Sequence, residues 1–207
     1  IVAGRPELIA RPVRATQAFA DLCAAADVIA IGPGLGNGHR ARRWLATALE
    51  SGRPLVVDAD ALTLIAREPR RSEQWVLTPH PGEAARLLDC DAAAVQRDRA
   101  GALAGLVARF GGTCVLKGAG TLVSATAGPP WLCDRGNPGM ATAGCGDVLT
   151  GIIAALIAQG AAPGLAAAAG VFVHACAGDR AAASGERGLL AGDLIRELRA
   201  CVNPPWS

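Results

Sequence analysis

The sequence predicts an α/β fold in which a mainly parallel β-sheet is covered by helices on both faces. Short apolar runs without polar interruption alternate with Ala-, Leu- and Arg-rich segments of helical length. Unbroken apolar strands of this kind are typical of parallel sheets that are buried on both sides. Three of the apolar runs end in loops rich in Gly, Pro, His or Asp. In open α/β sheets such loops, beyond the carboxyl ends of the strands, bind the ligand.

The expected elements follow from this alternation of apolar runs, turn residues and helical segments. The strands are expected at residues 26–31, 54–57, 75–78 and 113–117, the last followed by a turn into residues 121–124. Helices are expected at residues 39–50, 82–88, 147–158, 165–183 and 193–201, with a further helix within residues 92–110. Residues 203–207 (NPPWS) are expected to form a tail, because two prolines cannot continue a helix.

Composition favours one large domain covering residues 1–207. The chain has 207 residues, of which 51% are hydrophobic and 18% charged, so it has enough apolar surface for a buried core. The net charge of +2 gives no strong attraction to nucleic acid or anionic membranes. The absence of Tyr, with only three Phe and four Trp, leaves no evident base-stacking platform. We therefore expect small-molecule partners, and neither nucleic acid nor a membrane.

The cysteines and the apolar segments indicate that the protein is located in a reducing cytoplasm. The seven cysteines are odd in number and include no C-x-x-C pair, which argues against a disulfide framework and against a tetrahedral zinc site. The first residues lack the charged-then-apolar pattern of a signal peptide. The apolar stretch 148–158 is too short to span a bilayer.

The strongest local motif is the glycine-rich segment 136–147, which leads into an apolar helix. Glycines allow close backbone approach to a ligand, and a helix N-terminus offers free N–H groups and partial positive charge to a phosphate. Asp147 stands at that start, where a carboxylate can accept a proton from an attacking hydroxyl. The alternative is an ordinary N-cap Asp. The flanking glycines favour the functional interpretation.

A second motif, Lys117-Gly118-Ala119-Gly120-Thr121, follows a strand. A lysine with adjacent backbone amides and a threonine hydroxyl can hold nucleotide phosphates or the groups near them. Lys117 is the only lysine beside 19 arginines. The spacing does not match a P-loop, and the motif taken alone somewhat favours a β-turn that carries an exposed lysine.

Two further loops are weaker candidates for ligand contact. His80 lies between two prolines that fix the backbone, so its ring direction is set for a ligand, whereas Glu83 is expected mainly to cap the next helix. The segment 32–36 (GPGLG) is too compact for a Rossmann fingerprint, but Gly34 lies in a tight turn where a ligand can touch the backbone.

The remaining polar candidates have plainer explanations. Asp58 and Asp60 are expected to cap the next helix, with a water-mediated Mg²⁺ contact as the alternative. His174 is expected to be a satisfied residue in the core or in a ligand wall. Cys145 is expected to contribute its backbone N–H to an anion hole, with a low-pKa thiol as the alternative.

Taken together, these motifs resemble those of the ADP- or ATP-dependent NAD(P)H-hydrate dehydratases over nearly the whole chain. The matching segments, in family order, are GPGLG (32–36), VVDADAL (56–62), LTPHPGE (77–83), VLKGAGTLV (115–123) and GNPGMATAGCGDVLTGIIAALIAQG (136–160). The resemblance implies a ribokinase-like fold. It also implies repair of NAD(P)H hydrated at C6, in which a nucleotide phosphorylates the ring hydroxyl and phosphate is then eliminated.

The resemblance also implies roles for individual residues. Asp147 would be the base, and Gly144, Cys145 and Gly146 would form the anion hole. Residues 117–121 and Gly146 would bind ADP or ATP, with Mg²⁺ on the phosphates and its protein ligands unknown. Gly34 and His80, with Asp147, would contact the hydrated dinucleotide. The resemblance further implies that the chain forms a homo-oligomer, often a tetramer in this family, and that its partner is a fused or separate NAD(P)H-hydrate epimerase.

Two departures from the family pattern accompany the resemblance. Cys145 stands where the family usually has Thr or Ser, which matters if that hydroxyl holds the phosphate and is tolerated if only the backbone does. Residues 6–9 (PELI) resemble a segment that in the family follows an opening strand–helix unit, so the resemblance implies that this sequence is N-terminally incomplete.

Two other functions share the same motifs. A ribokinase-like kinase for a vitamin precursor or sugar would use the same glycine-rich helix start, but would leave a stable phosphorylated product instead of inorganic phosphate. A non-catalytic nucleotide-binding remnant would bind nucleotide without turnover. We rank the dehydratase first, the kinase second and the remnant third.

Overall fold

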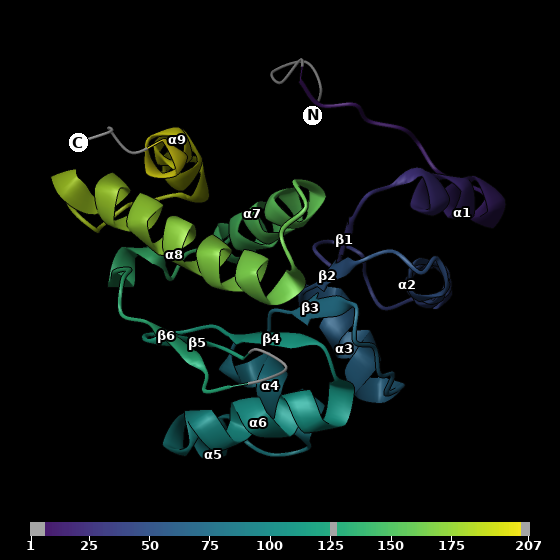
Figure 1. Ribbon diagram of the computed structural model, residues 1–207, viewed down its shortest axis with the longest axis horizontal. Helices are drawn as coiled ribbons and strands as arrows, with labels where there is room; N and C mark the ends of the chain where they lie inside the picture. Colours follow the sequence, from purple (N-terminus) through teal and green to yellow (C-terminus); the bar gives the residue numbers. More distant parts are fainter. Residues whose placement is uncertain (1–6, 125–127, 204–207) are drawn as a thin grey trace.

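The computed structural model describes residues 7–124 and 128–203 and shows an α/β arrangement around a six-stranded sheet (Figure 1). The strands lie in sequential order, β1-β2-β3-β4-β5-β6. Their bounds are β1 Ile29–Ile31, β2 Leu55–Val57, β3 Trp75–Leu77, β4 Thr113–Leu116, β5 Thr121–Val123 and β6 Trp131–Cys133. The first four strands are parallel, and β5 and β6 continue the sheet antiparallel.

Helices connect the parallel strands and fill the C-terminal third of the chain. Their bounds are α1 Thr16–Ala25, α2 His39–Glu50, α3 Ala59–Arg67, α4 Pro81–Leu88, α5 Ala92–Arg97, α6 Arg99–Phe110, α7 Cys145–Ala158, α8 Pro163–Ala181 and α9 Ala191–Val202. Short 3₁₀ turns occupy Pro138–Met140 and Ala182–Ser184. Within the described ranges, no helix is long and apolar enough to cross a bilayer.

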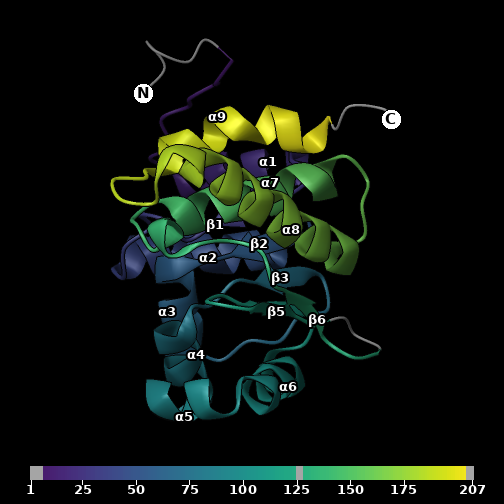
Figure 2. The ribbon, with the colours of Figure 1, turned by 90° about the vertical axis from the view of Figure 1, so that its left-hand side faces the viewer.

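The two faces of the sheet are covered by different parts of the chain. Right-handed crossovers between sequential parallel strands put the connecting helices on the same face, so α2, α3, α4 and α6 share one core with α1. The opposite face is left for α7 and α8, which form a second core (Figures 1 and 2). Helix α9 packs outside α7 and α8.

Strand β2 illustrates how the sequence serves both cores. Successive side chains of a strand point to opposite faces, so Leu55 and Val57 enter the core of the crossover helices, whereas Val56 enters the core under α7 and α8. All three are at most 2% exposed. The continuous apolar run is therefore the pattern that a doubly covered central strand requires, which confirms the predicted fold class.

Several elements differ from the sequence prediction. Helix α7 begins at Cys145 instead of Asp147, and residues 92–110 form two helices because Asp98 ends α5 and caps α6 by accepting from the Gly101 N–H. Helix α1 and strand β6 were not predicted as elements, and helix α3 was expected only as a helix of unstated bounds after Asp58. Of the predicted C-terminal tail, residues 204–207 lie outside the described residues.

Candidate functional site

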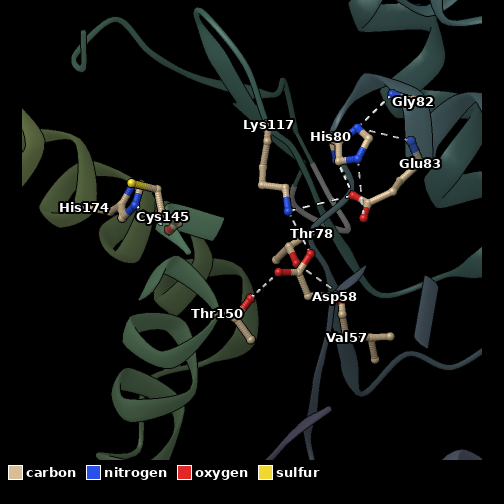
Figure 3. Close-up of polar contacts among 10 residues, drawn as sticks. All are labelled: Val57, Asp58, Thr78, His80, Gly82, Glu83, Lys117, Cys145, Thr150 and His174. Atoms are coloured by element: carbon tan, nitrogen blue, oxygen red, sulfur yellow. Dashed lines mark hydrogen bonds and ion pairs between the residues drawn. The ribbon is translucent and has the colours of Figure 1, made fainter. Parts of the chain in front are cut away.

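The predicted motifs meet at the carboxyl edge of the parallel strands. The loops that follow β1, β2, β3 and β4 carry Gly34, Asp58, His80 and Lys117, and Asp58 and Lys117 approach the first turn of α7 at Gly146. Figure 3 shows Lys117 reaching from its loop toward Asp58, with Thr150 of α7 on the other side of that carboxylate. Residues far apart in the sequence are thereby brought together where the fold class predicts a ligand.

The centre of this edge is a buried ion pair between Asp58 and Lys117. Lys117 Nζ lies 2.7 Å from Asp58 Oδ1 and 3.8 Å from Glu83 Oε2. The second carboxylate oxygen, Asp58 Oδ2, accepts a hydrogen bond from Thr150 Oγ1 at 2.9 Å. Asp58 is 1% exposed, so this carboxylate is withdrawn from water and needs both partners.

The start of α7 is built for close approach by another group. Gly144 is the N-cap residue with φ of 88°, a left-handed conformation that favours glycine. A Cβ on Gly146 would lie 3.3 Å from Lys117 Nζ and 3.7 Å from Asp58 Oδ2, so the missing side chain leaves room for the ion pair. The first N–H groups of a helix lack intrahelical partners and carry partial positive charge. The lysine therefore adds its charge beside an anion-favouring helix end.

Asp147 lies in the first turn of α7 and is exposed. Among the described residues, its carboxylate makes no hydrogen bond or ion pair. An unengaged carboxylate at a helix N-terminus can accept a proton from an incoming group. The alternative that Asp147 is an ordinary N-cap is wrong, because Gly144 occupies the N-cap position and Asp147 lies within the first turn.

The glycine-rich segment before α7 is anchored on α8. Asp179 accepts from the Gly136 N–H and from the Asn137 side-chain amide, each at 3.1 Å. Gly178 lies close against Met140, since a Cβ at Gly178 would be 2.2 Å from the methionine sulfur. These contacts fix the path of the chain toward the helix start.

The loop 117–121 is the turn between the antiparallel strands β4 and β5, not a strand-to-helix loop. Arg99, the first residue of α6, donates from its guanidinium to the backbone carbonyls of Leu116, Lys117 and Gly120. Burial lowers the pKa of this arginine from its ordinary value, yet an arginine remains charged at neutral pH. Thr121 Oγ1 donates to the Gly118 carbonyl at 2.9 Å, so its hydroxyl proton closes the turn.

We expect Arg99→Ala to lower the free energy of unfolding by about 2–3 kcal/mol, because the partly buried carbonyls of this turn lose a charged donor. Arg99→Lys should restore only part of the loss, because one ammonium cannot reproduce the planar fork of donors. Urea unfolding followed by circular dichroism would measure both variants. The control is Arg97→Ala on the neighbouring helix, an exposed arginine. Equal losses at both positions would contradict the anchoring role of Arg99.

His80 and Glu83 form a reciprocal cap at the start of α4. His80 Nδ1 accepts from the N–H groups of Gly82 and Glu83, and Glu83 Oε2 accepts from the His80 N–H at 2.8 Å. The His80 side chain is 52% exposed, with Nε2 3.6 Å from Glu83 Oε1. The cap sets the ring direction, as the flanking prolines predict, while the expectation that Glu83 serves mainly as a cap is incomplete because it also approaches Lys117.

The aspartates after β2 do not cap α3 as predicted. Asp58 occupies the N-cap position, but its side chain makes no capping bond and turns to Lys117 and Thr150. Asp60 Oδ2 accepts from the Gly36 N–H at 2.8 Å and so holds the glycine loop that contains Gly34. Asp58 pairs with Lys117 because a buried carboxylate needs a charged donor more than it needs a helix end. Asp60 instead accepts from a neutral backbone N–H of the neighbouring loop.

Cys145 packs into the small core formed with Leu189 and Leu194, and is 4% exposed. Burial raises the pKa of its thiol, against a smaller opposing effect of the hydrogen bond at Thr142, so the alternative of a low-pKa thiol is wrong. The Cys145 N–H donates to the Thr142 carbonyl at 3.4 Å. The N–H groups of Gly146 and Asp147 are therefore better placed than that of Cys145 to meet an anion.

His174 on α8 donates from Nε2 to the Cys145 carbonyl at 2.9 Å (Figure 3). Burial lowers the pKa of His174, the hydrogen bond to Cys145 acts in the opposite direction, and the charge of Lys117 adds to the lowering. The ring is thus a neutral, satisfied residue behind the helix start, as predicted.

Sequence reasoning missed three residues that shape this site: Arg99, Thr150 and Asp179. Thr150 had a usable signal, because it is a hydroxyl in an otherwise apolar helix, one turn after Gly146. Arg99 and Asp179 are polar residues on helices far along the chain from the loops that they hold. Nothing in their local sequence separates them from exposed charges.

Comparison with known proteins places the chain in a family. A family model described as NAD(P)H-hydrate dehydratase matches residues 1–200. The bifunctional NAD(P)H-hydrate repair enzyme Nnr of Coxiella burnetii is 50% identical over 206 residues, covering 99% of this chain and 42% of that protein. The ADP-dependent (S)-NAD(P)H-hydrate dehydratase of Neisseria meningitidis serogroup B is 40% identical over 209 residues, covering 96% of this chain and 69% of that protein. The chain thus spans less than half of the bifunctional relative.

Solved structures share the fold. The ADP/ATP-dependent NAD(P)H-hydrate dehydratase from Bacillus subtilis, co-crystallized with ATP/Mg²⁺ and soaked with CoA, has a TM-score of 0.78 at 28% identity, covering 88% of this chain and 70% of that one. A ribokinase-like superfamily protein from Enterococcus faecalis V583 has a TM-score of 0.77 at 32% identity, covering 90% and 66%. The fold is therefore ribokinase-like, and the chain belongs to the NAD(P)H-hydrate dehydratase family.

Proposed function

We propose that this chain catalyses the nucleotide-dependent dehydration of hydrated NADH or NADPH to NADH or NADPH. The observation that carries the proposal is the start of α7, where the exposed Asp147 directly follows Gly146, and the Lys117 ammonium lies close to Gly146 beside the free helix N–H groups. A base, an anion-binding helix end and a fixed cation are the parts that phosphoryl transfer to a hydroxyl requires.

The reaction proceeds in two stages. Asp147 accepts the proton of the hydroxyl at C6 of the hydrated ring as that oxygen attacks the terminal phosphorus of the nucleotide. The new O–P bond forms while the bond to the leaving nucleotide phosphate breaks. The C–O bond at C6 then breaks, inorganic phosphate leaves, and the adjacent ring carbon loses a proton to water, which restores the double bond. Phosphate is a far better leaving group than hydroxide, so the nucleotide drives an otherwise difficult elimination.

The bound groups divide between the loops of the carboxyl edge. Residues 117–121 (Lys117, Gly118, Ala119, Gly120 and Thr121) and Gly146 contact the nucleotide, in a turn that Arg99 holds rigid. Gly34 and His80, with Asp147, contact the hydrated dinucleotide; Gly34 is exposed and the His80 cap sets its ring direction. The common edge of the sheet supports this division, because the two reactants must meet at Asp147.

The anion hole lies at Gly144, Cys145 and Gly146 and acts through the backbone, with the Gly146 N–H as its main donor, because the Cys145 N–H is engaged by the Thr142 carbonyl. The Cys145 thiol is buried in an apolar core, which supports an anion hole that needs no side chain at this position, where the family usually has Thr or Ser. Its replacement of that hydroxyl is then tolerated.

Magnesium fits this site as an ion bound mainly by the nucleotide. Within the described residues, no group of three or more His, Cys, Asp or Glu side chains is arranged to hold a metal. Mg²⁺ usually keeps several waters and binds through one or two carboxylates plus phosphates. When bound, it neutralises phosphate charge, and the chain's part is to position those phosphates at the helix start.

Measurement of reduced nicotinamide tests the function. The purified chain is mixed with hydrated NADH, Mg²⁺ and either ADP or ATP, and the near-ultraviolet absorbance of the reduced ring is followed. We expect a rise that requires nucleotide, and the more effective nucleotide is the physiological donor. Phosphorylated dinucleotide that accumulates without a rise would instead indicate a kinase.

We further propose that the chain assembles as a homo-oligomer and works with an NAD(P)H-hydrate epimerase, either fused to it or separate.

A further inference from the structure

The Asp58 side chain does not cap the helix that follows it. It directly follows β2 and occupies the N-cap position of α3, where an aspartate usually accepts hydrogen bonds from the first helical N–H groups. Its side chain makes no such bond and is 1% exposed. Both carboxylate oxygens are engaged elsewhere, Oδ1 with Lys117 Nζ at 2.7 Å and Oδ2 with Thr150 Oγ1 at 2.9 Å.

These contacts tie three distant elements together. Lys117 is 59 residues from Asp58 and lies in the β4–β5 turn, and Thr150 is 92 residues from Asp58 and lies on α7. Thr150 is one turn after Gly146, so both face the same side of the helix. The carboxylate is thus seated against the first two turns of α7, with the ammonium 3.3 Å from the position of a Cβ on Gly146.

A lysine without such a partner would not hold a fixed position. Its ammonium sits on a flexible four-carbon stem, and ordering it costs side-chain entropy. The paired carboxylate removes that freedom before any ligand binds, which is the preorganisation that electrostatic catalysis requires. Glu83 Oε2, at 3.8 Å, limits movement on the other side.

We infer that Asp58 is a positioning residue for phosphoryl transfer: locked by Thr150, it holds the Lys117 ammonium at the first turn of α7, against the phosphoryl group that moves there. This inference rests on the proposed function for its reaction. Asp58 itself contacts neither reactant, and its whole effect passes through Lys117.

A double-mutant cycle in kcat separates this role from a structural one. We expect Lys117→Met to lower kcat about 100-fold, as for removal of one fixed donor, and Asp58→Asn to lower it about tenfold or more. In the Lys117→Met background, Asp58→Asn should change kcat by less than about twofold, because residues that act through one another are not additive. Asp27→Asn, an exposed aspartate before β1, is the matched control.

A double variant whose loss of kcat equals the product of the two single losses would overturn the inference, because Asp58 would then act independently of Lys117. Thr150→Val is a second test in case Asp58→Asn fails to fold. It keeps the charges of Asp58 and Lys117 and removes only the hydrogen bond to Asp58 Oδ2. It should lower kcat in the same direction, by a smaller factor, with little change in the KM for nucleotide. An unchanged kcat in Thr150→Val would contradict the inference that the Thr150 hydrogen bond helps to hold Asp58 in place.

A readout without activity distinguishes failure of this inference from failure of the proposed function. Lys117 is the only lysine of the chain, so protein grown with ¹³C-lysine gives a single set of side-chain NMR signals. In the wild type we expect Lys117 Cε signals displaced from those of a free lysine, and a further shift on adding ADP. In Asp58→Asn the signals should collapse toward the free position. Identical lysine signals in the two proteins would overturn the positioning role, whatever the activity.

Discussion

Asp147→Asn is expected to lower the nucleotide-dependent formation of NADH about 10²- to 10⁴-fold, the range that a general base contributes. The substitution keeps the shape of the side chain but removes the proton acceptor. Because Asp147 is exposed and makes no hydrogen bond or ion pair among the described residues, the fold has little reason to change. Loss of the helix-dipole interaction alone is worth less than about 1 kcal/mol at an exposed position. Reduced-nicotinamide absorbance measures the activity, and urea unfolding measures the stability.

The matched control is Asp193→Asn, which replaces an aspartate in the first turn of another helix, α9. It should keep its activity while losing some stability, since the carboxylate charge that pairs with Arg196 and interacts with the helix N-terminus is removed. An Asp147→Asn protein that remained as active as the wild type, with its nucleotide dependence intact, would remove Asp147 from the role of base.

Gly32→Ala is expected to destabilise the chain by at least about 3 kcal/mol, through overpacking and a strained backbone together. Gly32 directly follows β1 with φ of 139°, and a Cβ there would lie 1.7 Å from the Asp58 carbonyl oxygen. Neither the backbone of Asp58 nor that of Gly32 is free to shift, because the Asp58 N–H donates to the Ile31 carbonyl at 3.1 Å. Urea unfolding gives the change directly.

Gly52→Ala separates the clash from the conformational cost. Gly52 has φ of 68°, but nothing lies within 4 Å of a Cβ at that position. It should lose only the cost of a left-handed alanine, roughly 1–2 kcal/mol. Equal losses in the two variants would mean that the close approach of β1 and β2 at Asp58 does not limit the size of residue 32.

The parallel part of the fold could be predicted because its signals are local. Buried strands such as Leu55–Val57 and Trp75–Leu77 consist of unbroken apolar residues, and turn residues follow each one. The antiparallel strand β6 could not be predicted in this way, since Trp131 and Leu132 are exposed at a sheet edge and the run is only three residues long. Pairing with β5, a tertiary event, defines it.

The site was predictable where a motif lies in one stretch of chain. Gly144 to Asp147 fall at a helix start as expected, and His80 is held by its neighbours. The Asp58–Lys117–Thr150 cluster was not predictable, because it depends on contacts between residues 59 and 92 positions apart. Local propensity assigned Asp58 to the helix that follows it. In the structure the buried Asp58 carboxylate instead forms an ion pair with Lys117.

The most direct test of the central claim measures NADH and inorganic phosphate in the same reaction of the chain with hydrated NADH, Mg²⁺ and ADP or ATP. We predict that both appear together in equal molar amounts, and that both require the nucleotide. Formation of NADH without phosphate release, or of a stable phosphorylated dinucleotide without NADH, would contradict a dehydration that runs through phosphorylation at the start of α7.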